Sequence, residues 1–351
     1  MVNVAIAGGT SPTLGRLITE AILATKKHQV IILSRAKTQS QQDTTSNLQQ
    51  ADNDTKHGAP IKHVDYASIP SLANAFTTHN INILISVLKP LDPNKTITYH
   101  SNLLSACQSA QVRRFIMSDW SLAPASHAHV SILGHKAQLH ELGKKHMLAA
   151  QQNDEFVVEC CTIQNGGFLE YFVQGCGDLE LQAGLEDDLM LEYIDIGNRK
   201  LVIPCVETGE PARVTMTSLR DIANFVAASL DLPRGVMTGQ IGTAGWTGTF
   251  ENVADVLKRL EPAVDVEKVY VTAEECGNKA EEYGQTFRAK IGKGDFDLVA
   301  FKGEMVAQMY AVLCGEEESG GISCGKMLND LCSEAKTADF DELLRKAWQK
   351  C

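Results

Sequence analysis

The sequence lacks any apolar run near the ~18 to 20 residues that cross a bilayer, so we expect no membrane contact. It also lacks a basic cluster, and its formal net charge of −11 repels the phosphates of nucleic acid, so no nucleic-acid partner is expected. No leader precedes the first apolar segment at Val2, which predicts a cytoplasmic location. The ten cysteines include no Cys-x-x-Cys pair, which favours reduced thiols over a disulfide or metal framework.

What the sequence does contain is a nucleotide-binding pattern at its start. The apolar segment from Val2 runs into a glycine turn, and a helix is expected to begin near Thr13. A second apolar strand then ends at Ser34-Arg35. Such a unit places backbone N–H groups and a helix N-terminus against a pyrophosphate. Arg35 stands where an acidic residue would bind a ribose hydroxyl, which suits the 2′-phosphate of NADP, and Lys37 is a second candidate.

The first half of the chain alternates strand and helix patterns, which predicts a doubly wound parallel α/β sheet of the Rossmann type. The polar stretch 38–60 is expected to be a loop. Further strands are expected over 61–65, 81–88, 114–118, 156–162 and 267–271, and helices over 68–76, 100–110, 219–230 and 250–260. We place a dinucleotide-binding domain at 1–165 and a smaller, mixed α/β substrate part at 166–351, of which 217–260 packs back onto the sheet. Residues after 279 show only weak helical patterns.

Several short strings occur in a recognisable order along residues 1–260. They are Gly8-Gly9-Thr10 with Leu14-Gly15, Ser34-Arg35, Val64-Asp65-Tyr66, Ile85-Ser86-Val87-Leu88, Ser118-Asp119-Trp120 and Asn165-Gly166-Gly167-Phe168. Together they resemble the NmrA-like and isoflavone-reductase-like proteins, atypical members of the short-chain dehydrogenase/reductase superfamily. The resemblance implies an NADP-binding domain and a C-terminal part that closes over the nicotinamide. It also implies either a reductase of phenylpropanoid-type compounds or a cofactor sensor that catalyses nothing.

The expected cofactor contacts begin in the glycine turn. Gly8, Gly9 and Gly15 are present, but Ser11-Pro12-Thr13 replaces the middle glycine of the family pattern, and the interval is one residue longer. We expect the hydroxyls of Thr10, Ser11 and Thr13 to donate to phosphate oxygens instead. Leu14 is a further expected contact in this turn, and Ser34, Arg35, Lys37, Asp65, Ser86, Val87 and Leu88 are expected contacts by their positions at or after strand ends. The resemblance implies that Asn165 and Phe168 contact the nicotinamide ring.

The sequence also lacks the Tyr-x-x-x-Lys pair of standard short-chain dehydrogenases, because none of its seven tyrosines has a lysine four residues on. Ordinary tyrosine-dependent reduction is therefore excluded. The isoflavone-reductase branch uses a lysine on the helix after the fifth strand. Alignment back from the sixth strand favours Lys144, with Lys136 as its rival and Lys145 on the same stretch. If 136–150 is helical, Lys136, His140 and Lys144 form one stripe, which is either catalytic or simply a solvated face.

The other expected site residues follow the fifth and sixth strands. Ser118 is expected to orient the substrate beside Lys144, and the two form the predicted catalytic pair. Substrate contacts are expected at Asp119, Trp120, His127, Lys136 and Gly167. His127 and His129 have no third ligand in view, so no metal is expected.

The resulting functional hypothesis is an NADP-dependent reductase of secondary metabolism. It would transfer a hydride to an activated C=C or C=O of a small aromatic or polyketide-like compound. Two alternatives stay open at this point: a non-catalytic NADP-binding redox sensor with a regulatory protein partner, and an isomerase or dehydratase on the same fold. A homodimer is compatible with each.

Overall fold

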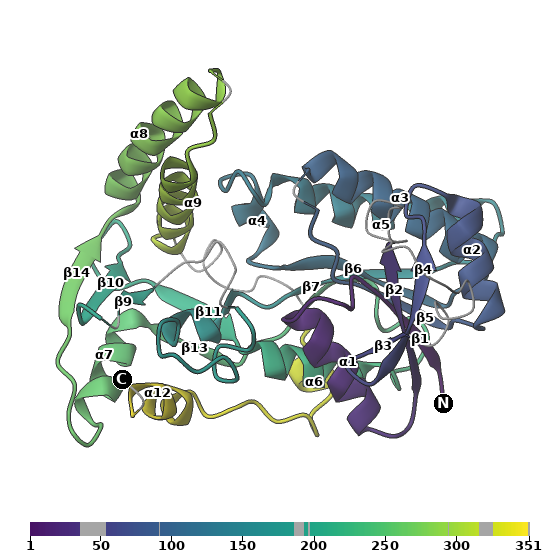
Figure 1. Ribbon diagram of the computed structural model, residues 1–351, viewed down its shortest axis with the longest axis horizontal. Coiled ribbons are helices and arrows are strands. Elements are labelled where there is room, and N and C mark those ends of the chain that lie inside the picture. The colour runs from purple at the N-terminus through teal and green to yellow at the C-terminus, as the bar shows by residue number, and fades with distance from the viewer. Residues whose placement is uncertain are drawn as a thin grey trace, which may run out of the picture.

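Short runs rich in Val, Ile and Leu form a central eight-stranded sheet (Figure 1). The computed structural model describes residues 1–35, 54–90, 92–185, 193–195, 197–293, 295–315 and 326–349. In spatial order the strands are β12 (Gly239–Gly242), β7 (Glu159–Gln164), β6 (Arg114–Ser121), β5 (Ile83–Ser86), β1 (Asn3–Ala7), β2 (Gln29–Arg35), β4 (Ala59–Val64) and β3 (Thr55–Lys56). Every neighbouring pair is parallel except β3 with β4. The carboxyl ends of the parallel strands therefore meet along one edge.

Helices cover both faces of this sheet, which confirms the predicted doubly wound architecture (Figure 1). One face packs against α1 (Leu14–Ala24) and α6 (Leu219–Ser229), and the other against α2 (Ile69–Thr78), α3 (Pro93–Ser109) and α5 (Gly134–Gln152). Side-chain caps fix several helix starts, since Ser68 accepts from the Ser71 amide and Asp92 from the Asn94 amide. Because Asp92 caps it, α3 begins well before the predicted residue 100.

One predicted loop is partly wrong. Within the stretch 38–60, only residues 54–60 lie in the described part of the chain, and they form the β3–β4 hairpin. His57 and Gly58 occupy its tip with φ of 53° and 80°, the left-handed values that a tight two-residue hairpin turn requires. Lys37 and the remainder of the predicted loop lie outside the described residues.

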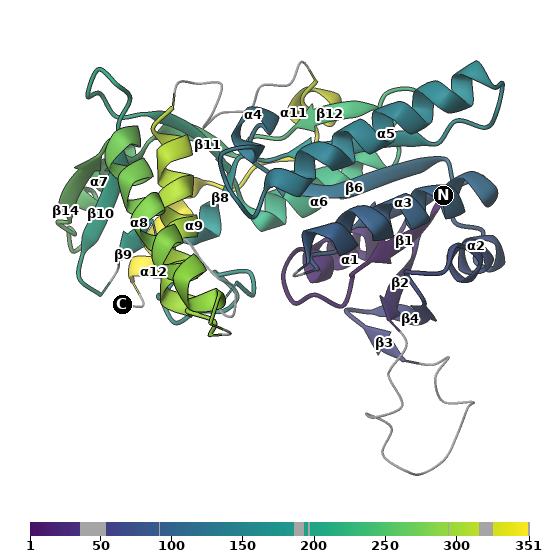
Figure 2. The same cartoon turned by 90° about the horizontal axis from the view of Figure 1, so that it is seen from above.

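The second half adds two small sheets and most of the remaining helices. One sheet contains β8 (Gly167–Phe168), β11 (Arg213–Thr217) and β13 (Trp246–Thr249), and the other β9 (Ile194–Asp195), β10 (Lys200–Pro204) and β14 (Glu267–Val271). The helices are α4 (Pro124–His127), the 3-10 turn η2 (Leu169–Phe172), α7 (Phe250–Lys258), α8 (Ala273–Ile291), α9 (Leu298–Leu313), α11 (Leu328–Leu331) and α12 (Phe340–Trp348). Helices α8 and α9 pack together as a hairpin (Figure 2). Among the described residues, no helix combines the length and apolar character that a bilayer crossing needs.

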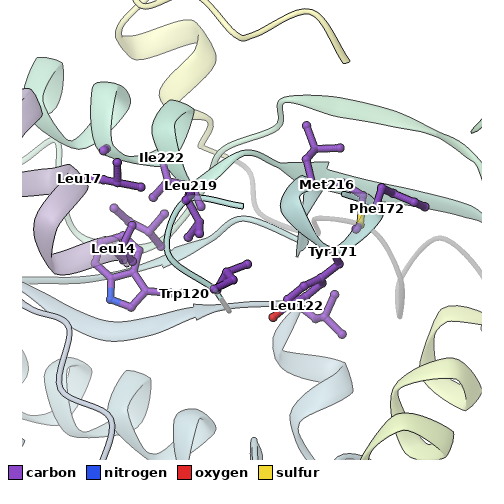
Figure 3. Packing of buried hydrophobic residues seen from close by; sticks show 14 of the residues in the cluster. Leu14, Leu17, Trp120, Leu122, Tyr171, Phe172, Met216, Leu219 and Ile222 are labelled. Carbon is purple, nitrogen blue, oxygen red and sulfur yellow. The ribbon is translucent and has the colours of Figure 1, made fainter. Parts of the chain in front are cut away.

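A single apolar core joins the two halves. Leu14 of α1 and Trp120 of β6 belong to the same buried cluster as Phe172 and Met216 of the second half (Figure 3). Phe172 lies at the centre of an aromatic group, with ring centroids 4.9 Å from Phe250 and 5.3 Å from Tyr193. The predicted division at residue 165 stays a prediction, and this core runs across it. All eight cysteines in the described ranges are free and buried.

Candidate functional site

The carboxyl end of β6 departs from regular strand geometry. Its register with β7 shifts between Met117 and Ser121, and Trp120 adopts a left-handed φ of 46°. The Trp120 indole donates to the Ser86 carbonyl at 2.9 Å, and the ring is buried beside Leu14 (Figure 3). Bulges of this kind re-aim neighbouring groups and are common next to active sites. Here the bulge leaves the carbonyl of Asp119 free to accept a hydrogen bond from α5.

The donor of that hydrogen bond is Lys136, in the first turn of α5. Its Nζ donates to the Asp119 carbonyl oxygen. Burial lowers the pKa of the Lys136 amine to about 8; Asp119 opposes this effect and Lys89 adds to it. Lys144 and Lys145 lie further along the same helix and are exposed. The predicted stripe therefore exists, and only its first lysine reaches the sheet edge where strand ends meet.

A buried acid lies directly behind Lys136. The Asp119 side chain is only 1% exposed, and Ser121 Oγ donates to its Oδ1 at 2.6 Å. His127 Nε2 lies 2.9 Å from Ser121 Oγ. Burial raises the pKa of Asp119 to about 6, while Lys136 and the Ser121 hydrogen bond oppose this rise. Burial also lowers the pKa of His127 to about 4, so its imidazole is neutral near pH 7.

Ser118 ties the ends of β5 and β6 together. Its Oγ donates to the Leu88 carbonyl at 2.9 Å, and its amide donates to His100 Nε2 at 3.2 Å. His100 Nδ1 lies 2.7 Å from the Thr96 carbonyl, so that nitrogen carries the proton. Burial lowers the pKa of His100 to about 4. His100 escaped the sequence prediction because one histidine on a helix gives no signal of its partner on a neighbouring strand.

The glycine turn is closely packed, and its predicted contact with a cofactor stays a prediction. Gly8 has a φ of 81°, and a Cβ there would lie 3.1 Å from the Val87 carbonyl oxygen. A Cβ at Gly15 would lie 2.9 Å from the Gly8 oxygen. Both positions therefore require glycine, which lets the backbone approach a ligand closely. The Thr13 and Arg16 amides bond within the turn, to Ser11 Oγ and to the Ser11 carbonyl, so only the other N–H groups at the start of α1 could face a ligand.

The residues that replace the middle glycine bond to one another. Ser11 Oγ and Thr13 Oγ1 lie 2.8 Å apart, and the Thr13 amide donates to Ser11 Oγ. The predicted contribution of these hydroxyls to phosphate binding stays a prediction, as does that of Thr10. The side chain of Leu14 is buried beside Trp120, so only its backbone belongs to the turn. Gly9 packs on the core, where a Cβ would lie 3.0 Å from Ile32.

At the adenosine end, Arg35 lies exposed at the end of β2, next to Ser34. Asp65 follows β4, and its Oδ1 accepts from the Ala67 amide at 2.9 Å, which shapes the entry to α2. Tyr66 is buried, with its hydroxyl donating to the Leu33 carbonyl at 3.0 Å. An exposed guanidinium at this strand end fits the 2′-phosphate of NADP.

Asn165 follows β7, near the other end of the sheet edge, and is fully buried. Its Nδ2 donates to the Gly166 carbonyl at 2.8 Å, whereas its Oδ1 has no partner among the described residues. Gly167 packs against Met216, and the partly buried Phe168 ring lies 5.5 Å from that of Tyr171. An unpartnered buried amide oxygen here suits the carboxamide of a nicotinamide ring.

Residues 178–185, which we call the strap, reach back over the glycine turn. A Cβ at Gly184 would lie 2.7 Å from the Pro12 carbonyl oxygen. Glu180 of the strap pairs with Arg220 at 2.6 Å and with Arg16 at 3.6 Å. No sequence pattern predicted this contact. The strap places a part of the second half directly beside the first turn of α1.

Comparison with known proteins supports the same picture. Residues 2–291 match the model of the NmrA-like family. The chain is 30% identical to Oxidoreductase BOA1 of Botryotinia fuckeliana (strain B05.10) over 237 residues, which cover 67% of this chain and 68% of that protein. Two solved reductases share the fold at low identity. AtPrR2 with NADP+ and (+)pinoresinol has a TM-score of 0.67 at 17% identity, covering 99% of this chain and 98% of that one.

The second is an isoflavone reductase, with a TM-score of 0.67 at 15% identity and 98% coverage of both chains. Identities this low establish the fold, while the family match rests on most of the sequence. Three observations agree with that match: the Rossmann-type sheet, the closely packed glycine turn, and the relative that is named an oxidoreductase. The chain belongs to the NmrA-like family and has the fold of isoflavone-reductase-like oxidoreductases.

Proposed function

We propose that this protein is an NADP-dependent reductase of small-molecule metabolism. The observation that carries the proposal is the partly buried Lys136 amine, held on the Asp119 carbonyl at the sheet edge that also contains the glycine turn. Positioned amines with pKa values near the working pH are effective proton donors. Clefts at the carboxyl ends of parallel strands are where such folds bind their ligands.

The residues present fit a nicotinamide dinucleotide. Gly8 and Gly15 form a turn that a Cβ would fill, Arg35 offers a guanidinium for the 2′-phosphate, and Asn165 offers an unpartnered oxygen. When bound, NADPH supplies a hydride from its nicotinamide ring. The strap, through Glu180, would then hold the second half of the chain against the turn and keep water away from it.

Lys136 supplies the proton chemistry in this proposal. Hydride addition to an activated C=C or C=O leaves an electron pair on the carbonyl oxygen of the substrate. The Lys136 ammonium stabilises that oxyanion and then gives up a proton, so Lys136 takes the role that sequence spacing gave to Lys144. Ser118 has a structural role in this proposal and donates no proton to the substrate, because its hydroxyl already donates to the Leu88 carbonyl.

The proposed substrate class rests on two aromatic side chains that follow β7 and on the relatives. The rings of Phe168 and Tyr171 contact each other in the segment that follows Asn165 in the sequence. One solved structure with this fold contains pinoresinol, an aromatic compound, and another is named an isoflavone reductase. We therefore propose a small aromatic or polyketide-like enone or ketone, with a secondary-metabolic role.

A second candidate is an NADP-binding sensor that catalyses nothing and offers its surface to a protein partner. The self-bonded Ser11 and Thr13 favour it, since they stand where the family pattern has a glycine. The deciding experiment titrates the purified protein with NADPH and NADH by fluorescence, then follows NADPH absorbance with a panel of aromatic enones and ketones. NADPH oxidation supports the reductase, and tight binding without turnover supports the sensor. Substrate conversion at constant NADPH would indicate an isomerase or dehydratase, and no binding of either dinucleotide would refute both candidates.

A further inference from the structure

Three buried side chains behind Lys136 form a chain of hydrogen bonds that the proposed reaction does not itself use. Ser121 Oγ lies 2.6 Å from Asp119 Oδ1, and His127 Nε2 lies 2.9 Å from Ser121 Oγ and 3.4 Å from Asp119 Oδ1. Asp119 and His127 are each 1% exposed and Ser121 is 7% exposed. A cluster this polar and this buried requires that its donors and acceptors match.

The hydrogen bonds of this cluster run in one direction, from His127 through Ser121 to Asp119. The imidazole of His127 is neutral, and its Nε2 is the nitrogen with acceptors in reach, Ser121 Oγ and the Leu122 carbonyl at 3.2 Å. Nε2 therefore carries the proton, which leaves Nδ1 as a bare nitrogen without a partner among the described residues. The Ser121 hydroxyl accepts this N–H and donates to Asp119. The chain thus ends on one carboxylate oxygen, and it matches an ionised Asp119.

We propose that Ser121 and His127 are positioning residues that keep Asp119 ionised, and that this buried negative charge keeps the Lys136 amine protonated where the reaction needs it. The inference rests on the proposed function for the use of that proton. The network itself stands on the hydrogen bonds above.

The physical reason lies in the balance of charges in a dry site. Lys136 Nζ donates to the main-chain carbonyl of Asp119, which places the amine close to the carboxylate of the same residue. Burial favours a neutral carboxyl at Asp119 and a neutral amine at Lys136, and the opposite charge of the neighbour acts against burial in each case. Without the Ser121 donor, Asp119 takes up a proton at a higher pH. Lys136 then loses its negative neighbour, while burial and Lys89 still act against its charge. The pKa of Lys136 must therefore fall when Ser121 or His127 is removed.

The other titratable groups around this cluster do not replace Asp119. Burial lowers the pKa of His135, next to Lys136, to about 4, so that imidazole is neutral near pH 7. Burial also lowers the pKa of His140, one helical turn further along α5. Lys89 contributes a like charge. Asp119 is thus the only acidic group that acts on Lys136 among the described residues.

The test measures the protonation of Lys136 directly, without any substrate. The full-length protein is treated with cyanate over a range of pH, and carbamoylation of individual lysines is followed by mass spectrometry. Lys144, exposed on the same helix, is the internal control. The variants are Ser121→Ala with Ser121→Thr as its hydroxyl-bearing control, His127→Leu with His127→Gln as its hydrogen-bonding control, and Asp119→Asn. Ser121→Ala is also combined with Asp119→Asn. Thermal melts establish that each variant is folded.

Ser121→Ala and His127→Leu are expected to lower the pH midpoint of Lys136 carbamoylation by about one unit, from about 8, which is roughly a fivefold gain in reactivity at pH 7. Ser121→Thr and His127→Gln should remain near wild type, and Lys144 should not change. Adding Ser121→Ala to Asp119→Asn should give no further shift, because the serine acts only through that carboxylate.

The inference is overturned if folded Ser121→Ala has the same pH midpoint of Lys136 carbamoylation as wild type. It is also overturned if the double variant has a midpoint about one unit below that of Asp119→Asn. If a single variant does not fold, the double variant against Asp119→Asn decides the question. This outcome is separate from the proposed function. If the variants show the shift but the wild-type protein reduces no enone, the hydrogen-bond network is supported and the proposed reductase function is refuted. If the wild-type protein reduces an enone but the variants show no shift, only the reductase function is supported.

Discussion

Replacing Lys136 by Met separates the lysine that the structure favours from the lysine that sequence spacing favoured. Lys144→Met is the matched control, since both residues lie on α5 and methionine preserves most of the side-chain length. At ~1.5 Å of rise per residue, Lys144 lies about 12 Å further along the helix axis, so neither lysine can substitute for the other.

The expected size of the effect follows from the role of the amine. A positioned proton donor contributes ~10²- to 10⁴-fold to a rate, so kcat of Lys136→Met should fall by at least ~10²-fold. The affinity for NADPH should change by less than about twofold, because the glycine turn and Arg35 are untouched. Lys136→Met leaves the Asp119 carbonyl without its donor and the buried carboxylate without its cation, so a modest fall in melting temperature is expected and activity is compared between folded proteins.

Steady-state NADPH oxidation with a substrate found in the enone panel measures these values, and the pH profile adds an independent check. The protonated amine is the active form and its pKa is about 8, so wild-type kcat is present below pH 8 and is lost as the pH rises through that value. In Lys136→Met this alkaline limb should disappear. Wild-type kcat in folded Lys136→Met, or an equal loss in Lys144→Met, would show that our assignment is wrong.

Three further perturbations test the cofactor site and the fold. Arg35→Ser should weaken NADPH binding by ~10- to 100-fold and leave NADH binding unchanged, measured by fluorescence titration, because only NADPH carries the 2′-phosphate. Glu180→Gln should speed NADP release in stopped-flow experiments without moving the melting temperature, since the Glu180 side chain is 70% exposed and such pairs contribute only ~0 to 1 kcal/mol; an unaltered release rate would exclude a role for the strap. Burial raises the pKa of Glu170 to about 8, so the folded state binds a proton that the unfolded chain has lost, and stability should fall by about 1 kcal/mol per pH unit between pH 5 and 8. Glu170→Gln should flatten that dependence in melts across the pH range, and an unchanged slope would contradict the buried protonated acid.

The features that the sequence predicted well are those set by neighbours along the chain. The apolar strands are recognisable from their hydrophobicity and the turn at Gly8 from its glycines, and the helix that follows Thr249 is recognisable from its apolar spacing. The strand predicted over 267–271 is present with those bounds. By contrast, the hairpin at His57 was missed, because its tip lacks the usual Asn-Gly or Asp-Gly signal.

The site could be predicted only in part, since its decisive contacts join distant residues. Periodicity placed Lys136 and Lys144 on one stripe, but burial of the first depends on the bulge at Trp120, which no local pattern announces. In the same way, Asp119 and His127 were predicted to touch substrate because they follow a strand. The structure buries both behind Lys136, and whether they also meet a substrate stays a prediction.

The shared apolar core has a consequence for engineering. Strand β12, which flanks β7, and helix α6, which covers α1, both come from after residue 165. A fragment that ended at residue 165 would expose the unpaired edge of β7 and the apolar surface of α1 that α6 covers, so it should aggregate when expressed alone. Chimeras that swap whole halves between relatives would meet the same obstacle. New substrate preferences in this scaffold are therefore better sought by altering individual cleft side chains than by exchanging modules.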